Sequence, residues 1–286
     1  MPKPLKISIV TPCFNSIHTI RTTLDSVAGQ DYPHVEHIVV DGGSTDGTQD
    51  LLKRYPRLVW VSERDDGHYH AMDKGTRMAS GDVVAILNAD DYYHQGVLSK
   101  VAAAFKKHPH WDGLFGDIVF VDGQGREIFR RQEALFDHQV IRFGINVVNH
   151  QTLFLKRSVY LRLGAYRYRD FQNCCDYEYM LRLIRAGCRI GHIPVFIVNY
   201  RYHDHGQSAD VRVRANMANE VAAIQKEYGV PGGQVGKALL AYARVKRQVE
   251  KLLLRGQCDL IPGEWLLKKH LRAKTTFSSN IGVDKL

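Results

Sequence analysis

Short apolar segments alternate with helix-like stretches over the first third of the chain, and this alternation constrains the fold most strongly. Residues 6–11 and 36–40 are rich in β-branched side chains and almost continuously apolar, as expected for strands buried on both faces. Further strands are predicted at residues 58–61 and 82–87. Because strands that alternate with helices form parallel sheets covered by those helices, the sequence predicts an α/β fold with a mostly parallel, doubly wound sheet.

The intervening stretches carry apolar residues at helical spacing. Ser16 is the expected N-cap of the first helix, in which Ile20, Leu24 and Val27 recur on one face. Further helices are expected over residues 45–55, 69–79 and 176–187. Later strands are expected over residues 117–121, 152–155 and 195–200.

Basic residues are concentrated near the end of the sequence. Residues 211–286 contain 14 Lys and Arg against six Asp and Glu, so they hold nearly all of the formal net charge of +9. Such a tail suggests an anionic partner, either lipid headgroups or nucleic acid. Because residues 229–233 interrupt a helical and basic pattern, we expect a catalytic domain over residues 1–210 and a basic, mainly helical C-terminal extension over residues 211–286.

Other sequence features bear on the cellular compartment. No run of about 18 apolar residues occurs, and the first residues lack the apolar core of a signal peptide. The five cysteines include no C-x-x-C pair, so neither a disulfide framework nor a zinc ribbon is indicated. We therefore expect a cytoplasmic protein, in which any contact with the inner face of the membrane would be peripheral.

Residues 236–255 of the extension are expected to form an amphipathic helix. Its apolar stripe consists of Tyr242, Val245, Val249 and Leu252, and its basic face of Arg244, Arg247, Lys251 and Arg255. One interpretation is contact with an anionic membrane, to which each basic residue adds about 1 kcal/mol and which Trp265, Lys268 and Lys269 would extend. The other is packing of the stripe on the catalytic domain, with the basic face in solvent.

Polar residues follow three of the predicted strands, at the edge where open α/β sheets bind ligands. They occupy residues 11–15, 41–47 and 88–91, and none forms the G-x-G-x-x-G turn of a dinucleotide site. This disfavours a dehydrogenase. Asp90 and Asp91 are adjacent acids after a buried strand, where a hard cation such as Mg²⁺ or Mn²⁺ would offset their charge. The alternative is that they cap the following helix.

Several segments together resemble the large family of inverting glycosyltransferases with the GT-A fold, often called family 2. They are IVTPCFN, VVDGGSTDGT, ERDDGHYHAMDKG with the later ASGD and ILNADD, and CDYEYMLRLIRAG. His150 and Gln151, in the HQT segment, resemble a short motif before the acceptor region of that family. The resemblance covers residues 6–208 and implies a GT-A fold, a Rossmann-like sheet flanked by helices.

The resemblance also implies roles for individual residues. Contacts with the nucleotide sugar are expected from Thr11, Asp41, Asp65, Lys74, Asn88 and Asp91. Asp90 corresponds to the metal position of the D-x-D signature, with Mn²⁺ or Mg²⁺ as cofactor, and Asp176 corresponds to the general base. The chain departs from the family pattern at Asn88, an amide in place of the first carboxylate, and at Gly42, where many relatives have a second acid.

Two pairs of histidines could each present both rings on one face. His68 and His70 are interpreted as polar loop residues. His203 and His205 follow the last predicted strand, where relatives often have a loop that closes over the donor diphosphate. We therefore expect His203 and His205 near the metal or the phosphates.

The sequence thus predicts an inverting hexosyltransferase that moves a sugar from a UDP-sugar to a glycan or lipid-linked hydroxyl in surface polysaccharide assembly. Asp176 would accept the proton of that hydroxyl, and the metal would neutralise charge on the leaving diphosphate. A nucleotidyltransferase with the same strand-end acids is one alternative. A non-enzymatic anion-binding module is another, although a nucleic-acid partner is not expected, because no aromatic residues interleave with the basic ones.

Overall fold

The computed structural model describes residues 3–164, 166–202 and 211–256 of the 286 residues. The described strands are β1 (Ile7–Cys13), β2 (Val35–Asp41), β3 (Val59–Ser62), β4 (Val83–Ile86), β5 (Tyr92–Tyr93), β6 (Gly113–Val121), β7 (Glu127–Arg131), β8 (Phe154–Lys156) and β9 (Ile190–Arg201). The described helices are α1 (Ile20–Ala28), α2 (Thr48–Leu52), α3 (His68–Met78), α4 (Val97–Lys107), α5 (His138–Arg142), α6 (Arg157–Leu163), α7 (Cys175–Arg185), α8 (Val211–Glu227) and α9 (Gly233–Arg255), with a 3₁₀ turn at His150–Thr152.

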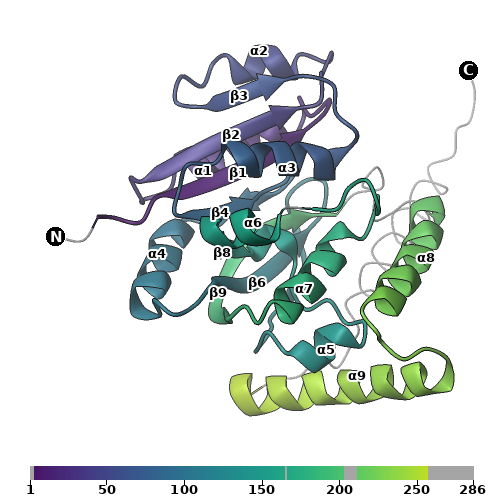
Figure 1. Ribbon diagram of the computed structural model, residues 1–286. Helices are drawn as coiled ribbons and strands as arrows, with labels where there is room; N and C mark the ends of the chain where they lie inside the picture. Colours follow the sequence, from purple (N-terminus) through teal and green to yellow (C-terminus); the bar gives the residue numbers. More distant parts are fainter. Residues whose placement is uncertain (1–2, 165, 203–210, 257–286) are drawn as a thin grey trace, which may run out of the picture.

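The strands form one sheet in the order β3-β2-β1-β4-β8-β6-β9-β5, with β7 paired to β6 (Figure 1). The four strands β1 to β4 are parallel, as predicted. The second half is mixed: β8 runs antiparallel to β4 and β6, while β6 and β9 are parallel. Parallel strands end at the same edge, so the turns after β1, β2 and β4 lie together there.

Helices cover both faces of the sheet, which explains the continuous apolar runs. Val10 of β1 packs with Met72 of α3 on one face, whereas Ile9 packs with Val101 of α4 on the other. A smaller cluster joins the end of β1 to α1 and α2. The approach of α3 to β1 requires Gly75, because a Cβ at that position would lie 2.2 Å from a Val10 methyl. The core therefore fixes α3 over the strands whose ends carry the polar turns.

Three details of the predicted helices were wrong. Helix α1 begins at Ile20, and the Ser16 hydroxyl donates to the Phe14 carbonyl instead of capping the helix. Helix α2 ends at Leu52, three residues earlier than expected. His68 and His70 lie in the first turn of α3, where the ring of His70 stacks on Tyr168, so they are not loop residues.

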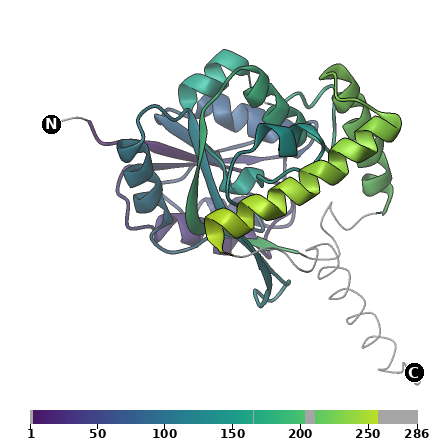
Figure 2. The same ribbon diagram turned by 90° about the horizontal axis from the view of Figure 1, so that it is seen from below.

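Helices α8 and α9 follow the sheet domain and pack against it. In Figures 1 and 2, α9 runs along the edge of the molecule beside α5, and α8 stands beside α7. Ile224 of α8 is fully buried in the largest apolar cluster. Among the helices of the described residues, none combines the length and the apolar character that a membrane span requires.

Helix α9 faces the domain with basic side chains. Arg247 donates to the buried carboxylate of Glu133, with Nε 3.0 Å from Oε2, and Arg255 Nη2 lies 2.8 Å from Oδ2 of buried Asp117. Lys251 is only 1% exposed. The apolar stripe is exposed, so of the two interpretations left open by the sequence, the one in which the stripe packs on the domain with the basic face in solvent does not hold. The reason is the pair of buried acids, which need cationic partners.

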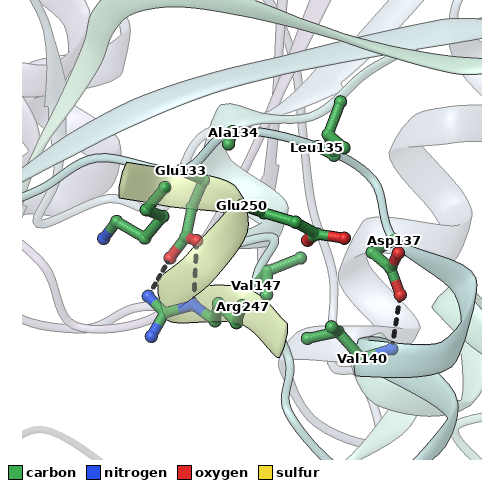
Figure 3. Close-up of a pocket in the computed structure, with 9 residues that line it drawn as sticks. Glu133, Ala134, Leu135, Asp137, Val140, Val147, Arg247 and Glu250 are labelled. Atoms are coloured by element: carbon green, nitrogen blue, oxygen red, sulfur yellow. Dashed lines mark hydrogen bonds and ion pairs between the residues drawn. The ribbon is translucent and has the colours of Figure 1, made fainter. Parts of the chain in front are cut away.

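A cavity of about 10 Å³ lies under α9 (Figure 3). It is lined by Glu133, Ala134, Leu135, Asp137, Val140, Val147, Arg247, Glu250 and Lys251. This volume holds about one water molecule, and its lining includes none of the predicted site residues. The cavity is therefore a packing gap at the docking surface of α9 and not a substrate site.

Candidate active site

Asp41, at the end of β2, is fully buried and bonded within the protein. Its Oδ2 accepts from the Ser44 amide at 3.0 Å and the Ser62 hydroxyl at 2.6 Å, while Oδ1 accepts from the Ser44 hydroxyl and, at 3.5 Å, the Cys13 thiol. The carboxylate thus shapes the turn after β2. Its predicted contact with a nucleoside stays a prediction. Because the carboxylate is buried, a ligand would contact the turn after β2 first.

Thr11 is also fully buried, near the end of β1. Its hydroxyl lies 2.9 Å from Nε2 of His37 on β2. Burial lowers the pKa of His37 to about 3, so the imidazole is neutral near pH 7. The side chain of Thr11 therefore ties two strands together, and its predicted contact with the nucleoside stays a prediction.

The next part of the site is built around Gly42. Oδ1 of Asp65 accepts from the Gly67 amide at 2.9 Å, and a Cβ on Gly42 would lie only 2.9 Å from the other carboxylate oxygen. The same Cβ would lie 3.4 Å from the ring of Phe14, which is 62% exposed. Asp65 thus occupies the space left by the missing side chain at Gly42.

Sequence reasoning assigned no role to Phe14. An aromatic ring that is exposed at the strand end beside Asp65 is a platform on which a planar base can stack. Its position within the IVTPCFN segment was the available signal, because a large apolar residue in a strand-end turn has no core to enter. Lys74 of α3 pairs with Glu63 at 2.8 Å and also donates to the Arg64 carbonyl at 3.3 Å, so it lies beside the loop that holds Asp65.

Asp91 is completely buried in the turn after β4. Its Oδ1 accepts from the Arg201 amide at 2.9 Å, and its Oδ2 accepts from Gln151 Nε2 at 3.2 Å. Burial, and next the charge of Asp90, raise the pKa of Asp91 well above its ordinary value. The guanidinium of Arg201 also donates to the Asp90 carbonyl at 3.0 Å, so the end of β9 fixes this turn. Neither Arg201 nor its role was found from the sequence.

Asp90 and Asn88, in the turn after β4, are the residues that would supply oxygen ligands to the predicted metal. Asp90 is partly exposed, unlike Asp91, so its carboxylate is accessible from the strand-end edge. Among the residues that the structure describes, no group of three or more His, Cys, Asp or Glu could hold a metal ion. One carboxylate and one amide fit Mg²⁺ or Mn²⁺ held jointly with substrate phosphates, the mode that Mg²⁺ favours. His203 and His205 lie outside the described residues.

Asp176 lies in the first turn of α7 and meets His150. His150 Nδ1 is 3.8 Å from Asp176 Oδ2, and the other imidazole nitrogen is 3.4 Å from Asn88 Oδ1. The other Asp176 oxygen accepts from the Tyr69 hydroxyl at 3.3 Å. Burial would raise the pKa of Asp176, but His150 and further hydrogen bonds lower it, so the carboxylate is ionised near pH 7.

His68 belongs to the same neighbourhood, which its interpretation as a loop residue missed. Its pKa is lowered to about 4 by burial and by the nearby charge of His150, so it is neutral near pH 7. The signal was its place at the start of α3, shortly after the end of β3, near the edge where the other strand-end residues gather. His68 therefore offers a neutral donor or acceptor beside the carboxylate of Asp176.

Glu220 of α8 supports the segment that leads into α7. Its carboxylate accepts from the backbone amides of Gln172, Asn173 and Cys174 at 3.0, 2.9 and 2.9 Å, and from the Asn173 side chain at 3.0 Å. These amides lie just before α7, two to four residues ahead of Asp176, so Glu220 of α8 anchors the segment that leads into α7. Sequence reasoning did not find it.

The structure therefore brings two groups of predicted residues together. Asn88, His150 and Asp176 form one contiguous set, which Gln151 links to Asp91. Asp65 and Gly42 form the second, at the ends of β2 and β3. An ionised carboxylate at Asp176, the side-chain oxygen of Asn88 and the exposed ring of Phe14 are therefore the groups that a ligand could use there.

Comparison with known sequences gives a match to the family described as Glycosyl transferase family 2 over residues 8–170. A PGL/p-HBAD biosynthesis glycosyltransferase of Mycobacterium bovis is 32% identical over 181 residues, which cover 61% of this chain and 68% of that protein.

Comparison with solved structures gives similar folds. S. aureus TarS in a 1–349 form with UDP-GlcNAc has a TM-score of 0.59 at 18% identity, covering 86% of this chain and 81% of that one. The chain spans 55% of a longer TarS structure. A mannosyltransferase of Pyrobaculum calidifontis with GDP-Man and Mn²⁺ has a TM-score of 0.58 at 19% identity, covering 97% of this chain and 81% of that one. The predicted α/β fold of the GT-A type is confirmed.

Proposed function

Because the chain belongs to glycosyl transferase family 2, we propose that it is an inverting glycosyltransferase that uses a UDP-sugar, a divalent metal and Asp176 as general base. The observation that carries this proposal is the contact of His150 with both Asn88 and Asp176, since it joins the turn proposed to hold the donor to the proposed base. Family membership favours this function over the nucleotidyltransferase and the anion-binding module.

The donor would lie along the ends of β1, β2 and β4. Phe14 would stack on the base and Asp65 would accept from its edge, while Thr11, Asp41 and Lys74 shape the surrounding turns. Uracil is supported by the TarS complex with UDP-GlcNAc, whereas the mannosyltransferase complex contains a guanosine donor. We propose UDP, carrying a hexose, as the donor nucleotide.

Asp90, with Asn88, would hold Mn²⁺ or Mg²⁺ together with the diphosphate. When bound, the metal would neutralise the charge that develops on the leaving group. Asp91 and Gln151 would contact the transferred sugar; Gln151 has a buried side-chain oxygen without a protein partner. In this proposal His203 and His205 serve the metal or the phosphates from the segment after β9.

Asp176 would act on the acceptor hydroxyl. The carboxylate accepts the hydroxyl proton as that oxygen attacks the anomeric carbon, and the bond to the diphosphate breaks on the opposite face. Direct displacement with one base inverts the configuration at that carbon. His150 holds the base ionised and oriented, and its contact with Asn88 relates the base to the donor turn.

The acceptor is proposed to be a glycan or lipid-linked hydroxyl in surface polysaccharide assembly, as the names of relatives that make PGL/p-HBAD or teichuronic acid suggest. A cytoplasmic location and peripheral membrane contact stay proposals. They are supported by the net positive charge of residues 211–286. Arg247 and Arg255 of α9 contribute less to that support, because they are paired with acids of the domain. The division at residues 210 and 211 also stays a prediction.

The test is titration calorimetry with a panel of nucleotide sugars, with and without Mn²⁺, on wild type, Asp90→Ala and Asp176→Asn. We expect metal-dependent binding of one UDP-sugar, lost in Asp90→Ala and retained in Asp176→Asn. Transfer to a lipid-linked acceptor should fall by about 10²–10⁴-fold in Asp176→Asn.

Asp50→Asn is the matched control, because it removes an exposed carboxylate on α2 and should change nothing. Product stereochemistry, read by NMR, must be inverted relative to the donor. Failure of folded wild type to bind any nucleotide sugar with any metal would contradict the proposal.

A further inference from the structure

Helix α9 carries an apolar seam that the other described residues leave largely exposed. Five large side chains, Val235, Tyr242, Val245, Val249 and Leu252, are each between 48% and 64% exposed. Of the twelve exposed large apolar residues in the described part of the chain, seven lie on this one helix. Such a concentration on one element marks an interaction surface, because soluble monomers rarely expose contiguous apolar patches.

The spacing of the seam identifies the kind of partner. The residues of the seam are spaced alternately three and four positions apart, which is the a/d repeat of a coiled coil over three heptads. They are Val235, Ala238, Tyr242, Val245, Val249 and Leu252. A strict a/d stripe is narrower than the face with which a helix usually covers a core. In the last heptad Val249 falls at the a position and Leu252 at the d position, the combination that favours two strands in parallel coiled coils.

The rest of the helix is already occupied. Arg247 and Arg255 are paired with Glu133 and Asp117, and Lys246 is paired with Asp137, so these cations face the domain. Within the described helix, the basic residues left exposed are Lys237 and Arg244, both to one side of the seam. An anionic membrane would therefore meet an apolar stripe with few cations beside it, whereas membrane-surface helices carry basic residues on their polar face.

The size of the seam also fits a second helix. A helix of 23 residues is about 35 Å long. Covering a stripe of about 100° on each of two copies buries roughly 600 Å² in total, which lies below the value of about 1,000 Å² for a stable specific interface and corresponds to a weak, reversible contact. Such an area corresponds to a dimer that dissociates on dilution.

We propose that α9 pairs with α9 of a second copy of this chain along the Val235–Leu252 seam, forming a two-fold symmetric dimer. The contact is isologous, with the same residues on both copies, so it closes on itself without forming filaments. In each copy the sheet domain is attached to the other side of α9, through Glu133 and Asp117.

Sedimentation velocity of the full chain over a wide concentration range tests this proposal. Wild type should change reversibly from monomer to dimer. In the double variant Val245→Glu and Val249→Glu the dissociation constant should rise by at least about a hundredfold, because each buried carboxylate costs more than a factor of ten. Circular dichroism and nucleotide binding of this variant should match wild type, which shows that it folds.

Lys237→Glu is the control, since it makes the same acidic change on the same helix beside the seam, and its dimer should be unaffected. A wild type that stays monomeric at every concentration would overturn the proposal. A second result would also overturn it: binding of the wild-type monomer to phosphatidylcholine–phosphatidylglycerol vesicles that is lost in the double variant. The partner of the seam would then be a lipid surface.

Discussion

The imidazole of His150 lies 3.8 Å from the carboxylate of Asp176, and among the contacts of that carboxylate it does most to lower the pKa, against the opposing effect of burial. Burial alone would raise the pKa of Asp176, as it does for Asp91. The two acids of the candidate site therefore have opposite protonation tendencies. This difference supports the proposal that Asp176 is the base.

His150→Ala should move the acid limb of the pH–rate profile upward. In wild type the pKa of Asp176 is below its ordinary value, so its ionisation limits kcat/KM only in strong acid. Without His150 the effect of burial remains, the pKa rises, and activity falls as pH drops through that higher value. Each unit of rise costs a factor of about ten on the acid side. His110→Ala, on an exposed histidine, should leave the profile unchanged; an unshifted limb in His150→Ala would contradict this role.

Gly42→Ala should weaken binding of UDP by about tenfold, since the new Cβ would lie 2.9 Å from a carboxylate oxygen of Asp65 and would displace it. Calorimetry of the single and double variants provides the check. Asp65→Ala should weaken binding strongly in the wild-type background and little in the Gly42→Ala background, because both changes act on one contact. Fully additive losses would show that the two residues act separately.

Glu220→Ala should lower kcat while leaving the affinity for UDP close to wild type. The carboxylate holds three successive backbone amides just before Asp176, and its loss leaves the proposed base misplaced while the donor turns are untouched. Steady-state kinetics and calorimetry separate the two effects, and Glu220→Asp should recover part of kcat. Glu227→Ala is the control. Like Glu220, Glu227 is an acid on α8, but its partner is Arg167. Equal losses in kcat and in UDP affinity would contradict the assignment.

His37 should make the protein less stable in mild acid. Its folded pKa is about 3 because the ring is buried, whereas the unfolded value is near 6.5. The unfolded chain therefore binds an extra proton between these values, and stability falls as pH drops below about 6.5. Between pH 7 and pH 5 this effect amounts to about 2 kcal/mol. Urea unfolding at both pH values should show a smaller loss in His37→Gln than in wild type.

The sequence predicted the strand ends well, because β-branched runs and the polar turns after them are local signals. It placed Asn88, Asp90 and Asp176 at one edge by resemblance, and the structure brings Asn88 and Asp176 to opposite sides of His150. It could not predict Arg201 or Glu220, whose partners lie 110 and 46–48 positions away. The sequence around each of these two residues looks the same as that around a charged residue exposed to solvent.

The direction in which α9 faces was also beyond the sequence. A heptad stripe shows that a helix has an apolar side, but the choice of the side that meets the domain depends on what the domain offers. Here the domain offers buried Glu133 and Asp117, and two uncompensated buried charges would cost more than leaving the stripe in water. Those acids carry no local signal that marks them as buried.

The position of β8 between β4 and β6 has a consequence for synthesis on the ribosome. Strands β1 to β4 can assemble as soon as residue 86 has emerged, but β4 keeps one unpaired edge until residues 154–156 are made. At about 5–20 residues per second this edge stays open for several seconds. An unpaired, apolar edge strand can template pairing with another chain. Nascent chains of this enzyme should therefore depend on chaperones during that interval.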